Sequence, residues 1–142
     1  MTSFRIESRG LDEEFTAVAY GDPDRSGLAS WVPEGLLAVQ SYLERWGAGP
    51  KGEPFLRVVN GEAEAGYRAT TPVGGEGDVE PSDLPAGPAA VTLLDGDAEV
   101  DDAVAALRGW IEEQGGTPDG DPWENLLDGR LDGRREIVQP YS

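Results

Sequence analysis

The 142-residue sequence predicts an α+β domain made of two β-α-β-β modules, with one antiparallel sheet and both helices on one of its faces. One observation behind this prediction is a repeated joint: Leu43 to Phe55 (LERWGAGPKGEPF) matches Ile111 to Trp123 (IEEQGGTPDGDPW) in its glycines, prolines and final aromatic residue. The other is an apolar stripe that recurs at the same spacing. Such self-similarity at a fixed offset indicates a duplication. The matched stripes are Val32, Leu36, Val39 and Leu43, and then Val100, Val104, Leu107 and Ile111.

The first module begins with two strand patterns. Phe4 to Ser8 alternates apolar and polar residues, and Thr16 to Tyr20 is an apolar run of strand length. The first apolar stripe then follows the helical period. We expect its helix to start near Pro33, since a proline in the first turn leaves no backbone N–H unsatisfied, and to end at Gly47. Trp46 continues the stripe and is expected in the core.

A hairpin completes the first module. Phe55 to Val59 is a strand pattern, Asn60-Gly61 is a strong signal for a tight turn, and Glu64 to Thr71 is the returning strand. The stretch from Gly74 to Pro88 is expected to be a linker or an irregular edge segment. A short edge strand can cross it, but Pro81 argues against a central one.

The second module repeats this order. Ala89 to Leu94 is its first strand, the second stripe is its helix, and Trp123 to Leu127 and Arg135 to Val138 form its hairpin. Because one hairpin and one helix cannot cover their own apolar faces, we expect residues 1–73 and 74–142 to share one sheet as a single domain.

Composition excludes several classes of function. The chain has no cysteine or histidine, which removes disulfides, thiol chemistry and the commonest metal ligand. With no carboxylate spacing typical of a calcium loop and no phosphate-binding glycine motif, we expect neither metal nor cofactor. A net charge of −17 argues against direct binding to nucleic acid. No apolar run suggests a signal peptide or a membrane span, so the expected location is the cytoplasm.

The order of these blocks resembles the GyrI-like small-molecule-binding domain, which occurs alone or at the C-terminus of AraC-type and MerR-type transcription regulators. The resemblance covers nearly the whole chain. It is carried by Trp31 to Leu43 and Glu64 to Val73 in the first half, and by Ala106 to Glu124 and Arg135 to Pro140 in the second.

This resemblance implies a pocket for lipophilic, often cationic or planar, compounds. It also implies an acidic residue in the last strand that meets the positive charge of the ligand. That residue is Glu136 here, with Glu64 as its counterpart in the first half. Some stand-alone members are hydrolases that open cyclopropane-bearing DNA alkylators with a glutamate and a tyrosine. The usual tyrosine is replaced by Leu126, and by Val58 in the first half, which weakens that interpretation.

The candidate ligand-binding residues are Glu136, Trp123, Glu64, Phe55, Trp31 and Tyr20. Glu136 either faces a hydrophobic pocket and attracts a cation, or faces solvent and pairs with Arg134 or Arg135. The matched aromatic residues at positions 55 and 123 either stack on a planar ligand or fill the core. Glu124 is expected to be solvated.

The sequence therefore predicts non-catalytic binding of a small lipophilic, cationic or planar molecule in the groove between the two repeats, for sequestration, resistance or sensing. One alternative is a hydrolase of an electrophilic natural product. Another is an acidic protein that docks on gyrase or another DNA-binding enzyme. For a sensor, we expect a separate regulator chain as the partner.

Overall fold

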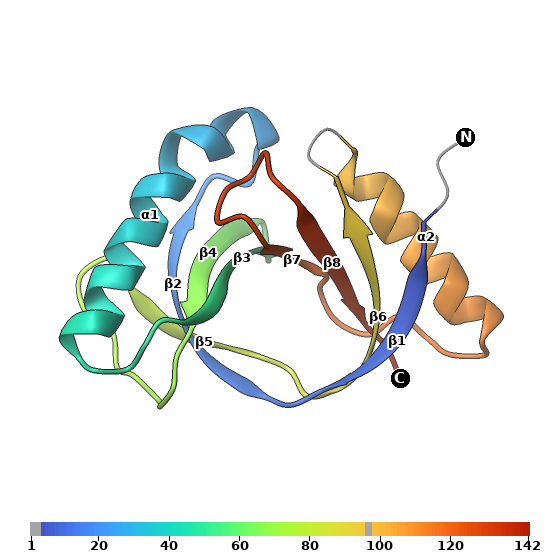
Figure 1. Ribbon diagram of the computed structural model, residues 1–142, viewed down its shortest axis with the longest axis horizontal. Helices are drawn as coiled ribbons and strands as arrows, with labels where there is room; N and C mark the ends of the chain where they lie inside the picture. Colours follow the sequence, from blue (N-terminus) through green and yellow to red (C-terminus); the bar gives the residue numbers. More distant parts are fainter. Residues whose placement is uncertain (1–3, 96–97) are drawn as a thin grey trace.

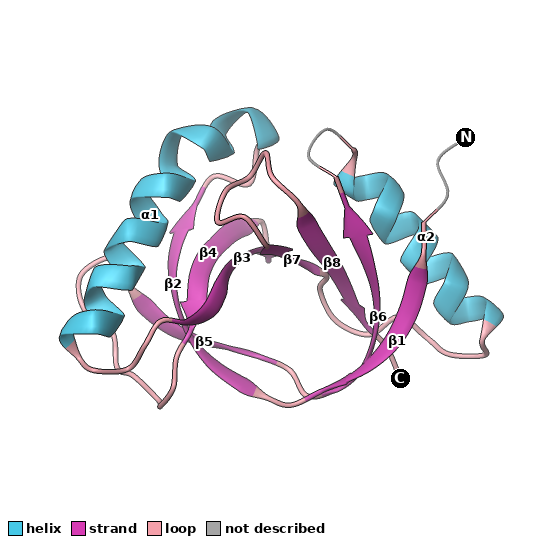
Figure 2. Ribbon diagram, viewed as in Figure 1, coloured by secondary structure: helices cyan, strands magenta, loops and turns pink. Residues whose placement is uncertain are grey.

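The computed structural model of the chain describes residues 4–95 and 98–142, and in them the predicted α+β fold is confirmed. The strands form one antiparallel sheet, and both helices pack on the same face of it (Figures 1 and 2). The elements in chain order are β1 (Ile6–Leu11), β2 (Glu14–Gly21), α1 (Arg25–Arg45), β3 (Lys51–Val59), β4 (Glu62–Arg68), β5 (Glu80–Leu84), β6 (Gly87–Leu94), α2 (Val100–Glu113), β7 (Trp123–Leu126) and β8 (Arg135–Pro140).

The strand order in the sheet is β1-β6-β8-β7-β3-β4-β2-β5. The two halves meet at the centre, where β3 pairs with β7. The outermost strand on each side comes from the opposite half, since β1 pairs with β6 and β5 pairs with β2. This order is compatible with a duplication, and each half begins with an additional strand, β1 or β5, at the two places where the sequence allowed one.

The pairing between the β1–β2 segment and the β5–β6 segment keeps one register from end to end. Leu11 lies opposite Gly87 and Glu14 lies opposite Leu84, so β1 and β2 run as one ribbon against β5 and β6. Figure 1 shows these paired segments crossing between the halves at the bottom of the view, opposite β3 and β7. The sheet therefore curves around the face that carries no helix, which we call the inner face. A buried cluster fills this face, formed by Val18, Phe55, Leu84, Ala89, Val91, Trp123 and Val138.

Helix α1 begins earlier than predicted. Its N-cap is Asp24, whose Oδ1 accepts a hydrogen bond from the Ser26 backbone N–H at 3.1 Å, and Pro33 lies inside the helix. A proline inside a helix removes one hydrogen bond. The extra turns, however, place Leu28 in the core. Trp46 was also expected in the core, but it forms the C-cap and is 64% exposed.

Small residues on the strands let both helices approach the sheet closely. Val39 and Leu43 of α1 pack on Ala17 and Ala19 of β2. Leu107 and Ile111 of α2 pack on Ala90 of β6 in the same way. The predicted stripes therefore face the sheet, which confirms their assignment to amphipathic helices.

Two predictions about the chain between the helices are also confirmed. Asn60 and Gly61 both have positive φ angles, of 52° and 81°, as the tight hairpin turn between β3 and β4 requires. Pro81 lies in β5, which is the last strand of the sheet, so its missing N–H interrupts no central pairing.

Candidate ligand-binding site

The strand register places most of the predicted site residues on the inner face. Tyr20 of β2 pairs with Glu64 of β4, Glu64 with Arg57 of β3, and Arg57 with Trp123 of β7. The neighbouring row of the same face contains Phe55, Asn125 and Glu136. Five candidates thus share one face, because side chains two residues apart on a strand point in the same direction. They are Tyr20, Phe55, Glu64, Trp123 and Glu136.

Trp31 is the predicted site residue that the structure places elsewhere. It belongs to α1, on the other face of the sheet, and its indole Nε1 donates a hydrogen bond to the Asp22 carbonyl at 3.1 Å. Its ring lies over Gly21, where an added Cβ would come within 2.3 Å of Trp31 Cε2. The side chain therefore ties the start of α1 to the end of β2.

Glu136 lies at the side of the inner face nearest to β1. Its carboxylate accepts two hydrogen bonds from the Arg9 guanidinium, Nη1 to Oε1 at 3.0 Å and Nη2 to Oε2 at 3.2 Å. The Asn125 amide donates a third, at 3.1 Å. The side chains of Glu136 and Arg9 are 19% and 40% exposed. The hydrogen bonds that Arg9 donates to Glu136 raise the pKa of Arg9 above its ordinary value. The partner of Glu136 is thus Arg9 from the other half, whereas the solvent-facing alternative had named Arg134 or Arg135.

Glu64 lies at the corresponding place on the other side of the inner face and is more deeply buried. Arg57 Nη2 donates to its Oε1 at 3.1 Å, and the Ser82 hydroxyl donates to the same oxygen at 3.0 Å. The side chains of Glu64 and Arg57 are only 5% and 11% exposed. Arg57 is also held by the Asp83 carbonyl at 3.2 Å. This acid is therefore enclosed by its own partners.

Tyr20 lies beside Glu64, at the end of the row of paired residues that runs through Glu64 and Arg57 to Trp123, and is 39% exposed. Burial raises the pKa of its phenol, and the negative charges of Glu64 and Glu80 raise it further. A neutral phenol next to a carboxylate can donate a hydrogen bond or contribute an aromatic edge to a ligand.

A third arginine links the two halves across the centre. Arg68 Nη2 donates to the Asn125 Oδ1 at 2.8 Å, and its Nε donates to Glu14 at 3.2 Å. Its guanidinium carbon lies 5.7 Å from the centroid of the Phe55 ring. Phe55 is fully buried beneath it. A chain of hydrogen bonds thus runs from Glu14 to Arg9 along one side of the inner face.

This network surrounds a cavity of about 200 Å³ on the inner face. Glu136 and Trp123 line it, together with Arg9 and with Leu84 from the crossing ribbons. Most ligand pockets have volumes of about 300–1,000 Å³. With the Arg9 side chain in place, this cavity is therefore small for a drug-sized molecule.

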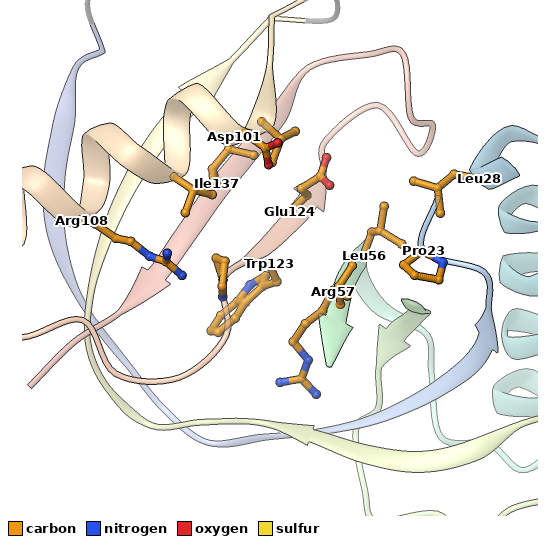
Figure 3. Close-up of a pocket in the computed structure, with 13 residues that line it drawn as sticks. Pro23, Leu28, Leu56, Arg57, Asp101, Arg108, Trp123, Glu124 and Ile137 are labelled. Carbon is orange, nitrogen blue, oxygen red and sulfur yellow. The ribbon is translucent and has the colours of Figure 1, made fainter. Parts of the chain in front are cut away.

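A second cavity, of about 440 Å³, lies on the helix face between α1 and α2 (Figure 3). Leu28 borders it on the α1 side, and Asp101 and Arg108 border it on α2. Glu124 also lines it. This acid was expected to be solvated, but it is buried and forms an ion pair with Arg135 at 3.3 Å. Trp123 lines both cavities and so lies between them.

Sequence reasoning missed the polar partners on the inner face. Arg57 and Asn125 each lie two residues beyond a predicted aromatic wall, so the alternation of a strand could have placed them beside it. Arg9 had no such signal, because it reaches the site from a strand that pairs with the other half. In the described residues, no group of three or more His, Cys, Asp or Glu side chains is arranged to hold a metal ion.

Comparison with solved structures finds the same fold in several proteins. EcmrR in a complex with DNA aligns with a TM-score of 0.78 at 17% identity over 98% of this chain. The chain spans 57% of that EcmrR chain. The isolated EcmrR C-terminal domain aligns with a TM-score of 0.73 at 17% identity, over 99% of each chain.

Two further structures share the fold. A hydrolase from Listeria innocua aligns with a TM-score of 0.66 at 13% identity, over 97% of this chain and 92% of its own. SAV2435 bound to tetraphenylphosphonium aligns with a TM-score of 0.54 at 12% identity, over 99% and 94%. No protein-family model and no curated protein matches the sequence. At these identities the likeness shows the fold alone. No helix in the described ranges is both long and apolar enough to cross a bilayer.

Proposed function

We propose that the chain binds a small lipophilic molecule, cationic or planar, in the inner cavity between its two halves and does not transform it. The observation that carries this proposal is the pairing of a largely buried carboxylate, Glu136, with a buried indole, Trp123, around one cavity. A desolvated carboxylate attracts a cation, and an aromatic wall favours a flat apolar body. Sequestration, resistance or sensing would follow from such binding.

The comparisons support the proposal at the level of the fold. SAV2435 carries tetraphenylphosphonium, a lipophilic cation, and EcmrR carries this fold as its C-terminal domain. The helix-side cavity is larger, but of the predicted residues only Trp123 lines it. Its buried acid, Glu124, is paired with Arg135, whose side chain is only 6% exposed, whereas the Arg9 side chain beside Glu136 is 40% exposed. We therefore assign the ligand to the inner face.

Thermal unfolding in the presence of lipophilic cations tests the proposal. A ligand that binds only the folded state stabilises it by about 2.7 kcal/mol at a hundredfold excess over its Kd, so Tm must rise with concentration. Glu136→Gln should remove most of this rise. Glu112→Gln changes an exposed acid on α2 and serves as the matched control. The proposal fails if no cation raises Tm, or if Glu136→Gln retains the full rise.

A further inference from the structure

The inner cavity already contains a cation, and this cation belongs to the protein. The guanidinium of Arg9 occupies the position in front of Glu136 that a cationic ligand would need. Nη1 donates a hydrogen bond to Oε1 of Glu136 at 3.0 Å, and Nη2 donates one to Oε2 at 3.2 Å. This two-pronged arrangement matches a planar cation with two parallel donors, and it is stronger than a single contact.

We infer that Arg9 is an internal competitor for the ligand site, and that the site selects a ligand whose cationic group is an aryl amidinium or guanidinium. This inference rests on the proposed function and names its ligand class. An incoming amidinium restores both hydrogen bonds that Arg9 gives up. A quaternary ammonium or phosphonium group supplies charge but no N–H donor, so it does not replace the hydrogen bond that Arg9 Nη2 donates to Glu136 Oε2, which is unfavourable.

Arg9 is able to leave because it has a second partner outside the cavity. Its Nη2 also donates to Glu7 Oε1 at 2.7 Å, and Glu7 is 65% exposed. Both residues lie on β1, at the end of the strand order. The Arg9 side chain can therefore rotate toward Glu7 and solvent while it keeps an ion pair. Its departure also enlarges a cavity that is small while Arg9 lines it.

The remaining groups of the cavity suit the rest of such a ligand. Asn125 keeps its hydrogen bond to Glu136 when Arg9 leaves, so the carboxylate stays oriented. Trp123, Leu84 and Val138 line the same cavity and provide apolar surface for a fused aromatic ring. The incoming planar cation takes over the ion pair with Glu136, while Arg9 keeps its ion pair with Glu7.

Equilibrium binding of three probes with one aromatic body tests the inference. The probes are 2-naphthamidine, its neutral carboxamide and the corresponding naphthyl trimethylammonium ion, with Kd measured by calorimetry. We expect the amidine to bind at least tenfold tighter than either of the others. Glu136→Gln should abolish this preference.

Removal of the competitor gives the sharper test. Arg9→Ala should tighten binding of 2-naphthamidine by tenfold or more, whereas Arg45→Ala, which removes an exposed arginine at the end of α1, should leave Kd unchanged. Arg9→Gln retains part of the side-chain stem and provides a second variant if Arg9→Ala folds poorly.

The outcomes separate the two proposals. If the trimethylammonium probe binds as tightly as the amidine and depends on Glu136, the proposed function stands and the selection by Arg9 is wrong. An unchanged or weakened Kd in both Arg9 variants also overturns the competitor role. If no probe binds the wild type or either Arg9 variant, both proposals fall.

Discussion

The two halves of the inner face hold equivalent acids in different ways. Glu64 lies opposite Arg57 in the β3–β4 hairpin, and Glu136 lies opposite Asn125 in the β7–β8 hairpin. In the first half the arginine comes from within the hairpin, and Ser82 of the crossing strand completes the site. In the second half these roles are reversed, since Asn125 comes from the hairpin and the crossing strand supplies Arg9.

This reversal changes how easily each acid can exchange its partner. The arginine of the first half is enclosed, with 11% of its side chain exposed, and three neighbouring groups accept from it. Arg9, which pairs with the acid of the second half, has a side chain that is 40% exposed, and it also donates a hydrogen bond to the exposed Glu7. One arrangement of strands thus produces an enclosed ion pair on one side and a partly exposed one on the other.

Replacement of each arginine by alanine should give the largest difference between the halves. Arg57→Ala leaves Glu64 buried without its charge partner, and we expect the free energy of unfolding to fall by about 3–5 kcal/mol. Arg9→Ala should lower it by about 1 kcal/mol or less, because the pair is partly solvated. Urea denaturation at neutral pH measures both, with Arg45→Ala as the exposed control. Equal losses at positions 9 and 57 would remove the distinction.

The hydroxyl that completes the first acid site should have a smaller effect. Ser82→Ala removes one hydrogen bond to Glu64 and leaves Arg57 in place, so we expect a loss of about 1–2 kcal/mol in unfolding free energy. Ser8→Ala is the matched control, since its hydroxyl bonds to Tyr141 on an exposed surface. A loss at position 82 no greater than that at position 8 would argue against an enclosed Glu64.

The titration of Tyr20 should show the smallest effect. Its pKa lies above the ordinary value of 10.0, chiefly through burial and then through the charge of Glu64. The stability from the neutral phenol is therefore fully present below pH 10 and is lost as the pH rises through the raised pKa. Glu64→Gln should lower this pKa toward its ordinary value. The tyrosinate absorbance, with Tyr20→Phe subtracted, measures it, and no change would place Tyr20 outside the influence of Glu64.

The repeats, stripes and turns were sufficient to predict the fold because they are local patterns of apolar and turn residues. The start of α1 was not predicted correctly, since the proline signal at position 33 was given more weight than the cap at Asp24 and the apolar Leu28. Glu136 was identified through the family resemblance, and Glu64 as its counterpart through the repeated pattern. Arg9 and Ser82 could not be predicted as partners of these acids, because they reach them only through strands that cross between the halves.

Each half of the chain contributes an edge strand to the other half. β1 lies before residue 73 but pairs with β6, and β5 lies after it but pairs with β2. A polypeptide cut between residues 73 and 74 would yield two fragments, each of which supplies the edge strand of the other's sheet. The same exchange between two identical single-module chains would produce a swapped homodimer. The connection of the modules in one chain allows the two acid sites to differ, which identical protomers could not do.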